Sequence, residues 1–178
     1  LTYLGTQLSH HGVEPAANLV IRDNPEDIRA FFFDSWKRSD LIITTGGLGP
    51  TTDDITRESI AEALGEELVF DPTIELALKE RFSQLGRPMP ENNLRQCYRL
   101  TNAEVLQNPF GTAPGLLLNK DGKMLVMLPG PAREMHPMFE QVVVPRLQKE
   151  GVFPEIDCYI QIRTAGIGES ALAEKVQH

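Results

Sequence analysis

A run of glycines followed by two aspartates is the part of this sequence best suited to chemistry. Gly46, Gly47 and Gly49 precede Asp53 and Asp54 within nine residues. Glycine adopts positive φ readily and lets a ligand approach the backbone closely. Carboxylates suit Mg²⁺ or Mn²⁺ better than Zn²⁺. The spacing therefore predicts a site for a small phosphate-bearing ligand, with a divalent cation beside it.

The flanking residues predict that this glycine–aspartate loop, residues 46–54, leaves the end of a strand. Residues 40–45 are apolar and β-branched, as in a strand buried on both faces, and residues 54–64 have helical spacing. A strand, a glycine loop and a helix together point backbone N–H groups and the positive end of a helix at an anion. The alternative is a tight turn in which Asp53 or Asp54 only caps the helix.

Two common phosphate-binding motifs do not fit the loop. The motif G-x-x-x-x-G-K-[ST] needs a Lys after the glycines, and none is present. The motif G-x-G-x-x-G fails on the spacing of its glycines. The loop therefore belongs to neither of these two motif classes.

Residues 45–56, T-G-G-L-G-P-T-T-D-D-I-T, resemble the signature of the molybdopterin-binding-like fold. That fold is shared by molybdenum-cofactor proteins of the MogA, MoeA and gephyrin type and by the N-terminal domain of CinA, the competence-damage-inducible protein. Leu48 and Asp53 make the loop more similar to CinA, because the cofactor-synthesis proteins usually carry Thr and Arg there while keeping an Asp at the position of Asp54. Four further stretches similar to CinA follow in the same order: residues 93–96, 111–115, 128–135 and 166–170.

The resemblance and the loop chemistry together predict a site built from several loops. Asp53 and Asp54 would hold a divalent cation, Mg²⁺, Mn²⁺ or Co²⁺, and Asp54 is expected to be required. Glu134 would join them as a catalytic residue, either as a metal ligand or by orienting water. The ligand-binding residues would be Thr45, Gly46, Gly47, Leu48, Gly49, Thr51, Asn93, Gln96, Gly111, Thr112, Gly115, Pro129 and Gly130.

The resemblance is compatible with three functions. Proteins that resemble the CinA N-terminal domain have been assigned metal-dependent ADP-ribose pyrophosphatase activity, so a hydrolase is the leading hypothesis. The second is a module that binds molybdopterin or another pterin phosphate without hydrolysis. The third is an inactive, dimerising scaffold of a longer CinA-like protein. Proteins of this fold form dimers and trimers, which implies a homo-oligomer.

Composition excludes several other classes of function. The net charge is −8, which argues against binding nucleic acid or an anionic membrane, because both need clustered Lys and Arg. No apolar run approaches the roughly 20 residues of a membrane span, and no signal peptide is evident. Cys97 and Cys158 lie too far apart for a CxxC motif, which predicts a reducing cytoplasm and no catalytic thiol. The four His residues show no metal-ligand spacing.

Helical segments alternate with short apolar strands, which predicts an α/β fold with three layers, α/β/α, around a mostly parallel sheet. We expect a first domain over residues 1–150 and, over 151–178, the beginning of a small α+β middle domain. Strands are predicted at 13–21, 40–45, 67–70, 104–106, 115–118, 124–128 and 157–164. Helices are predicted at 1–11, 25–37, 54–64, 72–85 and 131–149, with a closing helix after Gly168.

Overall fold

The computed structural model describes residues 2–153 and 164–176, which form two compact units. One unit comprises residues 16–152, and the other comprises residues 1–15 with 153–178. In chain order the elements are α1 (Thr2–His10), α2 (Pro25–Arg38), β1 (Leu41–Thr45), α3 (Thr56–Leu64), β2 (Leu68–Phe70), α4 (Pro72–Gln84), the 3₁₀ helix η1 (Glu91–Cys97), β3 (Tyr98–Leu100), β4 (Glu104–Leu106), β5 (Gly115–Lys120), β6 (Lys123–Leu128), α5 (Ala132–Met138), the π-helical segment η2 (Phe139–Val143), α6 (Val144–Lys149) and α7 (Glu169–Val176).

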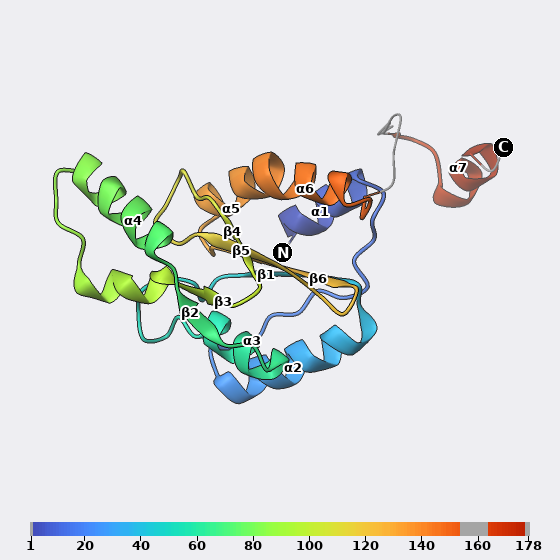
Figure 1. The fold of residues 1–178 in the computed structure, drawn as a ribbon. Helices are drawn as coiled ribbons and strands as arrows, with labels where there is room; N and C mark the ends of the chain where they lie inside the picture. The colour runs from blue at the N-terminus through green and yellow to red at the C-terminus, as the bar shows by residue number, and fades with distance from the viewer. Residues whose placement is uncertain (1, 154–163, 177–178) are drawn as a thin grey trace. The chain divides into compact units, whose positions relative to one another are not determined.

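The larger unit is built on a four-stranded sheet in the order β1-β6-β5-β4 (Figure 1). Strands β1 and β6 are parallel, whereas β6–β5 and β5–β4 are antiparallel. The expected α/β class is confirmed, but the described sheet is mixed rather than mostly parallel. Asp121 and Gly122, with φ of 54° and 74°, make the tight hairpin turn expected from an Asp-Gly pair, and this turn reverses the chain between β5 and β6.

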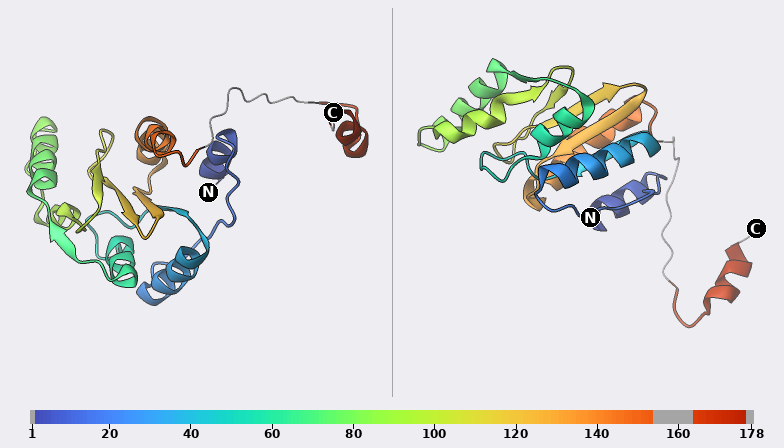
Figure 2. Two further views of the ribbon diagram at one scale, coloured as in Figure 1. Left: turned by 45° about the vertical axis from the view of Figure 1, so that its right-hand side comes forward. Right: turned by 90° about the horizontal axis from the view of Figure 1, so that it is seen from below.

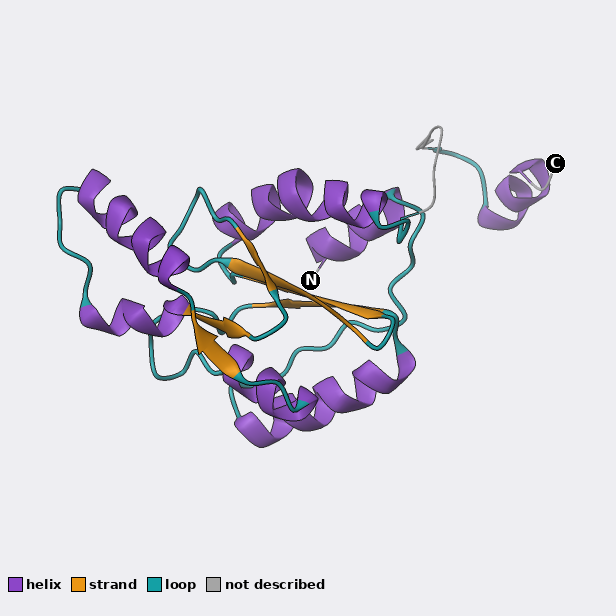
Figure 3. Ribbon diagram, viewed as in Figure 1, coloured by secondary structure: helices purple, strands orange, loops and turns teal. Residues whose placement is uncertain are grey.

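Helices cover both faces of this sheet, which gives the predicted three layers (Figure 2). Helices α2 and α3 lie on one face, and the segment from α5 to α6 lies on the other (Figure 3). Side chains of a strand alternate between faces, so Leu116 and Leu118 of β5 pack into one cluster with Phe32 and Trp36 of α2. The face of the sheet toward α2 is thereby buried in an apolar layer.

Two predicted elements differ from the structure. Residues 13–21 form no strand; Pro15 lies within them and has no N–H to donate to a strand ladder. The single helix predicted over 131–149 is divided into α5, η2 and α6. Pro137 lies inside α5 and Pro145 at the start of α6, and because neither can donate the usual helical hydrogen bond, a π-helical segment separates the two helices.

A second, two-stranded sheet of β2 and β3 lies beside α4 and η1 (Figure 1). Helix α4 begins where Asp71-Pro72 predicted it. The Pro- and Asn-rich residues from Arg87 to Asn93, which favour a loop, enter η1 at Glu91. Strand β3 follows η1 directly, so η1 is held in place by an antiparallel ladder.

The smaller unit contains α1 and α7. Helix α1 ends close to the predicted position, with Gly12 at φ 74° after it, and the rings of His11 and Phe153 stack with centroids 4.8 Å apart. The strand predicted at 157–164 lies almost entirely outside the described residues. None of the described helices is long and apolar enough to cross a membrane.

Candidate functional site

The glycine–aspartate loop begins where β1 and β6 end together. Thr45 stands opposite Leu128 in the parallel ladder, and the Gly46 N–H donates to the Leu128 carbonyl at 2.9 Å. A side-chain carbon placed on Gly130 would lie 3.3 Å from the Gly46 Cα atom. The loops after the two strands therefore lie backbone against backbone, as the parallel order of these strands predicts.

Gly47 fixes the path of the loop toward α3. Its φ is +66°, and a side-chain carbon there would overlap the hydroxyl of Thr56. The Thr56 N–H donates to the Gly47 carbonyl at 3.2 Å, which ties the loop to the first residue of α3. Only glycine satisfies both the backbone angle and the close packing at this position.

Asp54 closes a turn at the end of the loop rather than capping α3. Its Oδ2 atom accepts hydrogen bonds from the Thr51 N–H at 2.9 Å and from the Thr51 hydroxyl at 2.5 Å. The N-cap position of α3 is Ile55, which makes no side-chain capping bond. The capping alternative is thus wrong for Asp54, whose carboxylate instead packs beneath Gly49.

Asp53 lies next to this turn and is exposed to solvent. The Thr51 hydroxyl lowers the pKa of the Asp53 carboxyl, and its own backbone N–H and the charge of Arg95 lower it further. The hydrogen bond of the Thr51 hydroxyl in the structure is with Asp54 Oδ2. The backbone N–H of Asp53 and the charge of Arg95 both favour the ionised carboxylate, which is the form that binds a cation.

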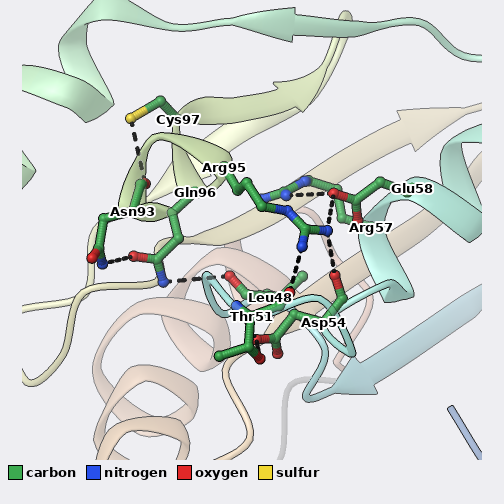
Figure 4. A network of polar contacts seen from close by, with 9 residues as sticks. All are labelled: Leu48, Thr51, Asp54, Arg57, Glu58, Asn93, Arg95, Gln96 and Cys97. Carbon is green, nitrogen blue, oxygen red and sulfur yellow. Dashed lines mark hydrogen bonds and ion pairs between the residues drawn. The ribbon is translucent and has the colours of Figure 1, made fainter. Parts of the chain in front are cut away.

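Asn93 and Gln96, expected among the ligand-binding residues, are buried behind the loop (Figure 4). The Asn93 amide donates to Gln96 Oε1 at 2.9 Å, and Gln96 Nε2 reaches the Leu48 carbonyl at 3.5 Å. Between them Arg95 donates to the Thr51 carbonyl at 2.5 Å and to the Asp54 carbonyl at 3.2 Å. The structure therefore places this motif against the back of the loop.

Glu134 belongs to a second group of contacts, around the loop before β5. It is buried, and its Oε2 accepts a hydrogen bond from Asn108 Nδ2 at 3.0 Å. The same Asn108 amide donates to the Ala113 carbonyl at 2.8 Å, and a side chain on Gly111 would overlap the Glu134 carboxylate. Within residues 2–153 and 164–176 no three His, Cys, Asp or Glu side chains are grouped closely enough to hold a metal by themselves.

A cavity of about 180 Å³ lies between α4 and residues 105–114. Gly111 and Thr112 line it, and Arg81 closes one side by donating to the Pro109 carbonyl at 2.9 Å. Of the remaining predicted residues, Gly115 is buried in β5 against the Met127 carbonyl, and Pro129 is buried at the end of β6. The predicted site residues thus fall into the glycine–aspartate loop, its buried support, and the surroundings of Glu134.

The sequence did not identify two residues that contact the predicted site residues, Arg95 and Asn108. Arg95 lies inside the recognised Asn93–Gln96 motif, and its charge within a Pro- and Asn-rich stretch was the available signal. Asn108 accepts from the Phe110 N–H at 3.0 Å, as an Asn before Pro often does in a turn. The partners of both residues are distant in the sequence, so spacing alone could not identify them.

The chain is similar to known proteins along nearly its whole length. A family model described as "Probable molybdopterin binding domain" matches residues 1–149. A putative competence-damage inducible protein of Symbiobacterium thermophilum is 47% identical over 174 residues, which cover 97% of this chain and 41% of the relative. A CinA-like protein of Dictyoglomus turgidum is 40% identical over 176 residues, with 98% and 42% covered. The chain spans about two fifths of the length of these curated relatives.

Solved structures agree with these sequence matches. The crystal structure of CinA from Thermoplasma acidophilum, described as a protein of unknown function, aligns with a TM-score of 0.71 at 30% identity, covering 84% of this chain and 85% of that one. A molybdenum cofactor biosynthesis protein B aligns with a TM-score of 0.51 at 17% identity, covering 83% and 80%. The second likeness shows the fold alone.

Proposed function

This chain belongs to the molybdopterin-binding domain family, among its CinA-like members, and on that basis we propose that it hydrolyses a nucleotide pyrophosphate such as ADP-ribose. Water would attack one phosphorus, and the bond from that phosphorus to the bridging oxygen would break. The products are AMP and ribose 5-phosphate. The relatives are more than twice as long as this chain, so the proposal concerns the activity of this domain.

The observation that carries the proposal is the arrangement of backbone around Gly46 and Gly47. Both have positive φ, and the loop runs from the end of β1 into the first turn of α3. Strand β1 is half-buried at the edge of the described sheet rather than buried on both faces as expected from its apolar residues. The Gly46 N–H is bonded to the Leu128 carbonyl, so the N–H groups that follow it would form the concave anion site, and the positive end of α3 adds to its potential. With a net charge of −8, the chain must hold an anion by such local donors rather than by a basic surface.

Asp53 and Asp54 fit the requirements of a divalent cation bound together with the substrate. Mg²⁺ commonly takes one or two carboxylates and completes its shell with waters and substrate phosphates, so a cage of three acidic side chains is not required. Asp53 is exposed and favours its ionised form, and Asp54 directs its Thr51 bonds to Oδ2. A bound cation would neutralise charge on the pyrophosphate and promote ionisation of water.

Glu134 would assist hydrolysis without holding the cation. Its carboxylate is fixed by Asn108 and packed on Gly111, and it lies four residues after Gly130, which contacts the glycine–aspartate loop. A buried carboxylate held in this way can orient a water or the ribose end of the ligand. We therefore expect replacement of Glu134 to weaken turnover less than replacement of Asp54.

The test is hydrolysis of ADP-ribose with Mg²⁺, Mn²⁺ or Co²⁺, measured by the appearance of AMP. We expect metal-dependent product from this chain and none from Asp54→Ala. Arg38→Ala, a change on the exposed side of α2, is the matched control and should keep full activity. Equal product from the Asp54 variant would refute the assigned role of Asp54, and absence of both turnover and binding would refute the nucleotide proposal.

A second candidate is binding of a nucleotide or pterin phosphate without hydrolysis. It is favoured by the contacts of two carboxyl groups, because the partly exposed Asp54 is bonded to Thr51 and the buried Glu134 to Asn108. These contacts engage oxygens that a hydrolase would otherwise present to metal or water. Calorimetry that detects ADP-ribose or a pterin phosphate binding, with no product formed, would favour this candidate.

A further inference from the structure

Two neighbouring side chains of η1 hold the glycine–aspartate loop from behind. Arg95 donates from Nη1 to the Thr51 carbonyl and from Nη2 to the Asp54 carbonyl, while Gln96 reaches the Leu48 carbonyl (Figure 4). The Arg95 bonds measure 2.5 and 3.2 Å, and the Gln96 bond is longer at 3.5 Å. Three carbonyls of one short loop are thus directed toward one element.

The direction of these carbonyls fixes the direction of other groups in the loop. In a planar trans peptide the C=O and the N–H of the next residue point to opposite sides. Because the carbonyls of residues 48, 51 and 54 face η1, the N–H groups of Gly49, Thr52 and Ile55 must face away from it. In the part of the chain that the structure describes, these three N–H groups donate to no backbone acceptor. They are therefore free to serve an anion.

Arg95 is itself held by a charged pair on α3. Glu58 Oε1 lies 3.5 Å from Arg95 Nη2 and accepts a hydrogen bond from Arg57 Nη2 at 2.8 Å. The Arg57 side chain is only 3% exposed, and its Nε atom has no hydrogen-bond partner. A guanidinium buried so incompletely paired is costly. The hydrogen bond from Arg57 fixes the Glu58 carboxylate, and this carboxylate in turn orients Arg95.

We propose that Arg95 is a positioning residue for phosphate binding, and that it keeps the loop in the conformation in which its N–H groups face the ligand. Arg95 contacts the carbonyls of Thr51 and Asp54, so its proposed role is to hold the loop rather than to bind the ligand. The role of Arg95 at a pyrophosphate site rests on the proposed function, whereas its hold on the loop does not. Lys cannot replace it, because one ammonium group does not reproduce the fork that spans two carbonyls.

The first measurement is hydrogen–deuterium exchange of the free protein. The N–H groups of Thr51, Asp54 and Thr56 are bonded within the loop and report its order. In Arg95→Ala we expect exchange over residues 48–56 to accelerate about 10-fold or more, while α2 stays unchanged. Arg38→Ala is the control and should exchange like the parent chain. Unchanged exchange over 48–56 in Arg95→Ala would overturn the proposal without reference to any ligand.

The second measurement is steady-state hydrolysis of ADP-ribose. Arg95→Ala should raise KM about 10-fold or more with a smaller fall in kcat, since loop order is needed to bind the phosphate. Added guanidinium should lower KM again in Arg95→Ala and leave Asp54→Ala inactive, and Arg95→Lys should resemble Arg95→Ala. Faster exchange with an unchanged KM would overturn the positioning role. A parent chain that neither binds nor hydrolyses ADP-ribose would overturn the proposed function, and the exchange result would still decide whether Arg95 holds the loop.

Discussion

Two aspartates of this molecule make the same contact with a threonine and differ in what else they meet. Asp54 accepts from the N–H and hydroxyl of Thr51, and Asp71 accepts from the N–H and hydroxyl of Thr73. Asp71 caps α4 and also accepts a hydrogen bond from Arg99 Nε at 2.7 Å on its second oxygen.

The nearby arginine makes the difference between the two sites. At Asp71 the guanidinium binds the carboxylate, and the Thr73 hydroxyl together with Arg99 lowers the pKa of Asp71 to about 2. At the other site the guanidinium of Arg95 binds the Asp54 carbonyl instead. An arginine on the carboxylate makes a structural cap, whereas an arginine on the carbonyl orders the backbone and leaves carboxylate oxygen for a ligand.

The largest expected effect comes from removing the charge at the loop. Asp54→Asn keeps an oxygen that can accept from Thr51, so unfolding free energy should change by less than about 0.5 kcal/mol. The proposed cation site loses a charge, and kcat/KM for ADP-ribose should fall about 100-fold or more. Steady-state kinetics and urea unfolding of the same preparations measure both quantities. Full activity in this variant would make Asp54 a purely structural residue like Asp71.

The corresponding change at the helix cap should reverse that pattern. Asp71→Ala removes the cap of α4 and leaves Arg99 without its carboxylate, which together should cost about 2–3 kcal/mol of unfolding free energy. Activity per folded molecule should be unchanged. Asp71→Asn retains a capping oxygen and should lose about half as much stability. Urea midpoints for the three chains test this order, and equal losses in both variants would contradict it.

The low pKa of Asp71 predicts a particular dependence of stability on pH. A carboxyl whose pKa is lower in the folded protein stabilises it above the unfolded pKa of 3.8, and this stabilisation disappears as the pH falls toward about 2. A difference of this size corresponds to about 2 kcal/mol. Asp71 is 12% exposed on its side chain, so solvent screens the effect little. Unfolding between pH 5 and 2 should depend less on pH in Asp71→Asn than in the parent chain.

The smallest expected effects come from the two threonine hydroxyls. Thr51→Val and Thr73→Val each remove one hydrogen bond to a carboxylate and keep the one from the backbone N–H, which should cost about 0.5–1.5 kcal/mol. Thr73→Val should also raise the pKa of Asp71, because that hydroxyl is its largest influence. The acid unfolding midpoint then moves to higher pH in Thr73→Val. An acid midpoint that does not move in Thr73→Val would contradict this role of the hydroxyl.

Local features of this fold could be predicted from the sequence, and distant contacts could not. The Asp71-Pro72 cap, the Asp121-Gly122 turn and the loop after β1 depend on neighbouring residues, and the structure has all three. The contact of Arg95 with Thr51 joins residues 44 apart, and that of Asn108 with Glu134 joins residues 26 apart. Periodicity carries no information about such partners. The antiparallel pairing of β4 with β5 was missed for a related reason, since apolar runs do not reveal strand direction.

Cys97 is completely buried at the end of η1, so the rate at which its thiol reacts reports how often η1 opens. Its side chain is 0% exposed, its sulfur lies 3.9 Å from the Asn93 carbonyl, and burial raises the pKa of the thiol. A thiol reagent can therefore modify it only during moments when η1 separates from its surroundings. The rate of Cys97 modification therefore measures the opening of η1, the element that contacts the glycine–aspartate loop. Peptide mass spectrometry distinguishes modification of Cys97 from modification of Cys158. Cys97 is thus a built-in probe of how often η1 separates from the glycine–aspartate loop.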